Sequence, residues 1–269
     1  MTAAIDSFDV FSAEFGAKRR IDLVEYPGKS HLDFIADKWR PKLEPQRDRA
    51  TIAFRALAQP KQTEDSWHKL QGQYGAPDSH WDWNEIVKEM GGSTHRLYAL
   101  VDEASVEAMM RLDLSKPSRL KISSYDPTVY IDYLAVAPWN RKQIQSPPRF
   151  NGFGTIMLGV AVSVSMAEGF HGRCGLHSLP QSEGFYSKAG MTLIPHEAKD
   201  GMRILGSWCE AGHFLPKPKD TISTTNWRPK SLLSKNFTEK ITQMAMGTLL
   251  AARIGLAPLE ALALGLPLA

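Results

Sequence analysis

The sequence has little cysteine, little net charge and no long uninterrupted apolar run. Only Cys174 and Cys209 occur among its 269 residues, too few for the disulfide framework of a small secreted protein. The formal net charge of +3 does not build the strong positive field of most nucleic-acid-binding proteins. The first twenty residues contain acids and lack a continuous apolar stretch, so they do not resemble a secretory signal. These absences favour a reducing, cytoplasmic setting.

The C-terminal segment is apolar, but charge and proline interrupt it. Between Ile241 and Ala269 the charged residues are Arg253 and Glu260, and two prolines divide the segment further. The resulting runs are shorter than the roughly 18 apolar residues expected of a membrane span. We therefore expect a packed helix or one that binds a partner, and no transmembrane span. Whether this tail makes a homo-oligomer or binds another protein is left open.

The composition is that of a globular protein, with 43% hydrophobic and 23% charged residues. The chain divides into a mostly helical, substrate-side region (1–93), an α/β core (94–210), and a linker with a helical tail (211–269). In the core, short runs rich in β-branched and aromatic residues predict an antiparallel meander. The predicted strands are 95–102, 106–114, 128–137, 173–179 and two more that begin at 191 and 202. Helices are predicted at 155–167, which should be buried, and at 181–189.

Two glycines stand directly before the longer of these helices, in the run from Arg149 to Gly154. Backbone N–H groups at such a turn converge on one point, and the helix dipole adds positive potential there, which suits a phosphate. Two glycines before a helix are also compatible with a plain turn. A dinucleotide-binding fingerprint is excluded because Met157 stands where it needs a third glycine. A phosphate loop of the Gly-Lys-Ser/Thr type is absent.

Three short motifs follow one another in the core. They are Leu134-Ala135-Val136 in a strand, Arg149-x-x-Gly152-x-Gly154, and Phe185-Tyr186-x-Lys188-x-Gly190. In this order they resemble the GNAT superfamily of N-acetyltransferases over roughly residues 94–210. The resemblance implies a mixed, mostly antiparallel twisted sheet with splayed central strands, flanked by helices. It also implies an enzyme with acetyl-CoA as its cofactor.

The resemblance further implies where the cofactor is held. Arg149 satisfies the first position of the loop signature, and Gly152 gives the pyrophosphate access to the backbone. Main-chain N–H groups for the pyrophosphate would come from Asn151, Phe153, Gly154 and Thr155. Leu134 and Val136 would hydrogen-bond the pantetheine arm through their backbones, as an added strand does.

Direct acetyl transfer to a primary amine needs a proton for the departing thiolate and a base for the amine. By resemblance, Tyr186 is the candidate general acid, and Asp132, a carboxylate within strand 128–137, is the candidate base. The alternatives are a packed tyrosine ring, a carboxylate in a local salt bridge, and a water chain as base. Strand alternation predicts that Tyr130, Asp132 and Leu134 share one face, while Ile131 and Tyr133 share the other.

Two further features are ambiguous. The stretch from Trp139 to Pro148 is longer than in typical relatives and would shape the cofactor entrance, contact the adenosine 3′-phosphate, or form a surface loop. The tryptophans Trp67, Trp81 and Trp83 either line an acceptor site or pack ordinarily. The spacing His171-x-x-Cys174-x-x-His177 predicts no metal site, because strand alternation points the cysteine away from the histidines.

The acceptor cannot be read from the sequence: it is an amine of a small molecule or of a protein. Two other functions remain open. One is a toxin-type acetyltransferase of aminoacyl-tRNA, although the charge shows no strong nucleic-acid signature. The other is a non-catalytic protein that binds acyl-CoA and serves as a scaffold.

Overall fold

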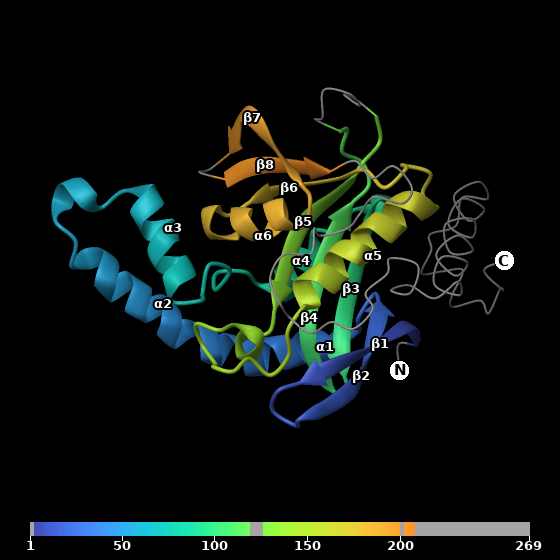
Figure 1. Ribbon diagram of the computed structural model, residues 1–269, viewed down its shortest axis with the longest axis horizontal. Coiled ribbons are helices and arrows are strands. Elements are labelled where there is room, and N and C mark those ends of the chain that lie inside the picture. Colours follow the sequence, from blue (N-terminus) through green and yellow to red (C-terminus); the bar gives the residue numbers. More distant parts are fainter. Residues whose placement is uncertain (1–2, 119–125, 200–201, 208–269) are drawn as a thin grey trace.

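The computed structural model describes residues 3–118, 126–199 and 202–207. The predicted linker and apolar tail, together with Cys209, lie outside these residues. One sheet of eight strands organises the described chain, in the order β1-β2-β3-β4-β5-β6-β8-β7 (Figure 1). The strands are β1 (Ala4–Ser12), β2 (Ala17–Glu25), β3 (His95–Asp102), β4 (Ser105–Asp113), β5 (Val129–Val136), β6 (Cys174–Ser178), β7 (Thr192–Lys199) and β8 (Met202–Ser207).

All neighbouring strands run antiparallel except β5 and β6, which pair in parallel. The parallel pair requires a crossover, and the helix α5 (Phe153–Ala167) supplies it. The predicted fold class, a mixed and mostly antiparallel sheet flanked by helices, is confirmed. The predicted strands and helices of the core also appear within two residues of their expected bounds.

Helices cover both faces of the sheet. On one face α5 crosses the strands, and its buried residues Met157, Leu158 and Val160 pack against the side chains of β2 to β6. On the other face lie the short helices α1 (Lys29–Phe34), η1 (Ile35–Trp39) and α4 (Trp83–Lys88). Their core residues are Leu32, Ile35, Trp39, Trp83 and Ile86, packed with Leu97, Ala99 and Met109 of the sheet.

The helical prediction for residues 1–93 is wrong over its first part, where β1 and β2 form a hairpin. In β2 the residues Ile21 and Leu23 are fully buried, and the strand pairs with β3 between Asp22 and Glu25. These residues form strands because they pair with a sheet whose other strands lie far along the chain. Sequence periodicity within 4–25 does not reveal that pairing.

The remaining N-terminal helices project from the sheet as an arm (Figure 1). The arm consists of α2 (Arg40–Arg55), η2 (Gln59–Lys61) and α3 (Glu64–Gln73). Its end returns to the core, because α3 contacts η6 (Pro180–Ser182), the turn before α6 (Glu183–Lys188). A Cβ placed on Gly72 of α3 would lie 2.8 Å from the side chain of Gln181. Within the described residues, no helix combines the length and the apolar character that crossing a membrane requires.

Candidate active site

The predicted pyrophosphate loop leads directly into α5. Gly152 is the N-cap residue, with φ +91° and ψ 0°, in the left-handed region where a side chain is strained. The next N–H groups, those of Phe153, Gly154 and Thr155, belong to the first turn and have no intrahelical acceptor. No side chain caps them. They are therefore available to an anion, and the helix dipole favours one there.

The two glycines of the motif serve different purposes. A Cβ on Gly152 would meet nothing within 4 Å, so its glycine is required by the backbone angle alone. A Cβ on Gly154 would lie 3.0 Å from the ring of Phe185 on α6. Gly154 therefore permits α6 to approach the first turn of α5. Asn151 is exposed beside them, whereas the Phe153 side chain is buried against Phe150, leaving only its backbone for a ligand.

Arg149, predicted to bind the cofactor, is engaged within the chain. Its guanidinium makes ion pairs with Glu107 at 3.1 Å, Asp102 at 2.9 Å and Glu14 at 3.0 Å. Its backbone N–H donates to the Trp139 carbonyl, and its own carbonyl accepts from Ala13. Through these contacts Arg149 anchors the loop to β3, β4 and the hairpin, and its guanidinium is engaged by three carboxylates.

The strands β5 and β6 splay apart. They pair only from Val129 to Ile131, although β5 continues to Val136. Because Ala137 donates to Glu107, the pair formed by Val136 and Ala108 is a non-hydrogen-bonded pair of the antiparallel ladder. The backbone groups of Val136, and of Leu134 two residues earlier, thus point away from β4 into the splay.

One of these backbone groups is already occupied. The Arg141 guanidinium donates to the Val136 carbonyl from Nε at 2.9 Å and from Nη2 at 2.6 Å. The same guanidinium pairs with Asp78 through both carboxylate oxygens, and both side chains are buried. The Val136 N–H, and both the N–H and the carbonyl of Leu134, remain to pair with a pantetheine arm. Arg141 itself is not free to contact a 3′-phosphate.

The predicted alternation along β5 is wrong, because a bulge interrupts it. Arg111 of β4 lies opposite Tyr133, and Leu112 lies opposite Ile131, so Asp132 has no partner across the ladder. As a result Ile131 and Leu134 both pack on the α5 side, whereas Tyr133 packs on the side of α4.

The bulge turns Asp132 toward Arg111, whose Nη2 is 3.0 Å from the Asp132 carboxylate. Burial raises the pKa of Asp132, while the Arg111 charge opposes the rise. His95 and Asp113 lie beside it: the three residues place ligand-type atoms within 4.8 Å of one another. His95 Nε2 is 3.9 Å from the Asp113 carboxylate. Asp132 therefore lies at the start of the splay among groups able to exchange protons.

Tyr186 lies on α6 and is buried in the core cluster formed with α5. Burial raises the pKa of Tyr186 to about 12, so the hydroxyl keeps its proton at neutral pH. Its ring packs against that of Phe185, with centroids 5.0 Å apart. The structure shows no contact between Tyr186 and Asp132, which pack on opposite faces of the sheet.

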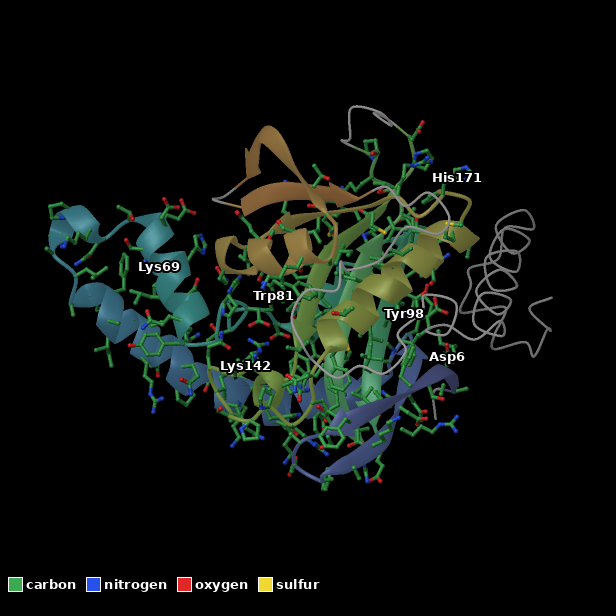
Figure 2. The ribbon with its side chains drawn as sticks, viewed as in Figure 1. Asp6, Lys69, Trp81, Tyr98, Lys142 and His171 are labelled. Atoms are coloured by element: carbon green, nitrogen blue, oxygen red, sulfur yellow. The ribbon has the colours of Figure 1, made fainter. Side chains whose placement is uncertain are left out.

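Two of the three predicted tryptophans lie together beside β5. Trp81 is 4.9 Å from the Tyr133 ring and 6.2 Å from Trp83, measured between centroids. Figure 2 shows Trp81 between the helical arm and the central strands. Trp67 is elsewhere, against Phe54 within the arm. The tryptophan pair, and not Trp67, therefore borders the strand that carries Asp132.

The sequence did not single out Glu107 and Asp102, the acids that hold Arg149. Glu107 lies within β4 and Asp102 ends β3, and the neighbours of both in these strands are mostly apolar. A buried acid within an apolar strand is itself a signal, because such a group requires partners. What the sequence lacks is any sign of which cations those partners are.

No family model matches the sequence, and no curated protein matches it. Solved structures do. The PaiA N-acetyltransferase from Thermoplasma acidophilum, in complex with coenzyme A, is 12% identical over 70% of this chain and 99% of its own, with a TM-score of 0.43. A predicted acetyltransferase with acetyl-CoA from Clostridium acetobutylicum is 13% identical over 66% and 94%, with a TM-score of 0.36.

The GNAT domain of the S. lividans protein PAT is 13% identical over 75% of this chain and 96% of its own, with a TM-score of 0.43.

The sequence motifs of this chain lie where the observed sheet and helices require them. A strand ending in Leu134-Ala135-Val136 splays from its parallel neighbour, and the glycine loop begins the crossover helix. The described residues thus have a GNAT-type fold.

Proposed function

We propose that this protein is an acyltransferase that uses acetyl-CoA to acetylate a primary amine. One observation carries the proposal: α5, whose first turn is uncapped, packs on β5, the strand that is no longer paired with β6 after Ile131. The first feature suits a pyrophosphate, and the second suits the amides of a pantetheine arm. Coenzyme A contains both groups, joined in this order.

Different residues would hold the two parts of the cofactor. The N–H groups of Phe153, Gly154 and Thr155, with Asn151 beside them, would hold the pyrophosphate, and Gly152 gives it access. Leu134 and Val136 would pair with the pantetheine arm. The role proposed for Arg149 is to position the loop, because its charge is satisfied by three carboxylates.

When bound, acetyl-CoA supplies the acyl group as an activated thioester. Tyr186 is the proposed general acid: it holds its proton at neutral pH and would release it to the sulfur that departs. Asp132 is the proposed base. Burial raises the pKa of Asp132, its ion pair with Arg111 favours the charged form that acts as base, and His95 with Asp113 offers a path for the proton it accepts.

The test combines calorimetry with coenzyme A and an assay of thiol release from acetyl-CoA over a panel of amines, peptides and charged tRNA. We expect micromolar binding, which is about −8 kcal/mol, and turnover on at least one amine class. Binding without turnover on any acceptor would favour a scaffold. Turnover on charged tRNA alone would favour a toxin-type enzyme. Absence of binding would refute the proposal.

A further inference from the structure

Glu107 is a buried carboxylate to which the proposed chemistry gives no part. It lies on β4 and is fully buried. Four donors surround it: Ser105 Oγ at 2.6 Å, Trp139 Nε1 at 2.7 Å, Asn140 Nδ2 at 2.7 Å and Arg149 Nη1 at 3.1 Å. Each partner other than Ser105 belongs to the segment between β5 and α5.

These partners come from the two ends of that segment. Trp139 and Asn140 form η5 (Pro138–Asn140), which follows β5, whereas Arg149 directly precedes the pyrophosphate loop. Asn140 also links the two ends directly, because its Oδ1 accepts a hydrogen bond from the Phe150 N–H at 3.0 Å. The Glu107 carboxylate thus accepts hydrogen bonds from both ends of the connection between β5 and α5.

We propose that Glu107 is a positioning residue that sets the pyrophosphate loop before the cofactor arrives. The inference rests on the proposed function, and it assigns a residue of β4, outside every motif, to cofactor affinity. Phe150 is fully buried and fixed through Asn140, and only Asn151 and Gly152 separate it from the first turn of α5. A shift of Phe150 would therefore displace the N–H groups that face the pyrophosphate.

A carboxylate suits this position better than its amide. All four neighbours of Glu107 donate, and two carboxylate oxygens provide about four acceptor sites. Glutamine would replace one oxygen by an NH2 group, which directs its own hydrogens at donors and leaves one of them buried without an acceptor. The loop would then have to move to restore the lost contact.

The decisive measurement compares two acetyl donors in Glu107→Gln. Acetyl-CoA carries the pyrophosphate, and S-acetylpantetheine does not. We expect the KM for acetyl-CoA to rise about tenfold, the equivalent of one charged hydrogen bond, with kcat preserved. The KM for S-acetylpantetheine should not change. Calorimetry with coenzyme A should show the same tenfold loss.

Glu25→Gln is the matched control. Glu25 is also a buried glutamate, and its partners are Tyr98 and Arg96 of β3. It touches none of the loop residues, so its substitution should leave the ratio of the two KM values unchanged. An equal effect of both variants on this ratio would overturn the assignment, since it would reflect general damage to the core.

Asn140→Ala keeps the proposal testable if the glutamine variant does not fold. It leaves the pair of Glu107 and Arg149 in place and removes the link that Asn140 makes from Glu107 to the Phe150 N–H. The same selective loss of acetyl-CoA affinity is expected, and wild-type affinity in this variant would overturn the inference. If the wild-type protein binds no coenzyme A, the proposed function fails; if it does and neither variant weakens binding, the positioning role alone fails.

Discussion

Replacing Gly152 by alanine isolates the backbone conformation of the pyrophosphate loop. Gly152 adopts φ +91°, and an added Cβ would meet no atom within 4 Å. The cost is therefore backbone strain alone, about 1–2 kcal/mol for an L-residue in the left-handed region. For a chain of this size that lowers Tm by about 2–8 °C. If the loop relieves the strain by turning, its N–H groups diverge and coenzyme A binds more weakly.

Thermal unfolding and calorimetry with coenzyme A measure the two effects on the same sample. Gly159→Ala provides the control, because Gly159 lies in the same helix, without a positive φ and with nothing within 4 Å of a built Cβ. Alanine there should stabilise the protein by up to about 1 kcal/mol through helix propensity. A Gly152→Ala variant with wild-type Tm and affinity would refute the argument that the left-handed angle sets the loop.

Three other substitutions test the site and its support. Tyr186→Phe should lower kcat by about 10²–10⁴ with unchanged affinity for coenzyme A, and in the wild type this group should not limit turnover until the pH approaches about 12. Asp132 must lose its proton to act as a base, so turnover should rise with pH through a pKa above that of an ordinary aspartate, and Asp132→Asn should abolish this limb of the pH–rate profile. Arg141→Met leaves the buried Asp78 carboxylate without its cation, and should lower the free energy of unfolding measured in urea by about 3–5 kcal/mol. Its exposed neighbour Lys142, changed to Met, should cost less than about 0.5 kcal/mol; equal costs for the two would contradict the importance of the ion pair.

The elements of the core could be predicted because their signals are local. The helix that follows Gly152 and Gly154 is long and apolar, and the strands before it have flanking turns. The sequence therefore indicates both the order of the elements and the place of the loop. The hairpin of residues 4–25 could not be found this way, because its strands are stabilised by pairing with β3, some seventy residues further along.

The contacts within the site depend on register and distant partners. The bulge at Asp132 arises from how β5 pairs with β4, and no residue within β5 predicts it. The role of Arg149 likewise depends on acids contributed by β3, β4 and the hairpin. Motif matching placed the loop directly before a helix, as the structure has it, but it cannot tell a side chain that faces a ligand from one that holds the loop in place.

Arg141 joins parts of the molecule that would otherwise be independent. With one end of its guanidinium it holds the Val136 carbonyl in the splay, and with the other it holds Asp78, in the segment that leads to Trp81. A ligand that moved the segment around Asp78 would pull on the strand proposed to bind the donor. By linkage, donor and acceptor would then change each other's affinity by the same factor, and the contacts of Arg141 would carry that coupling.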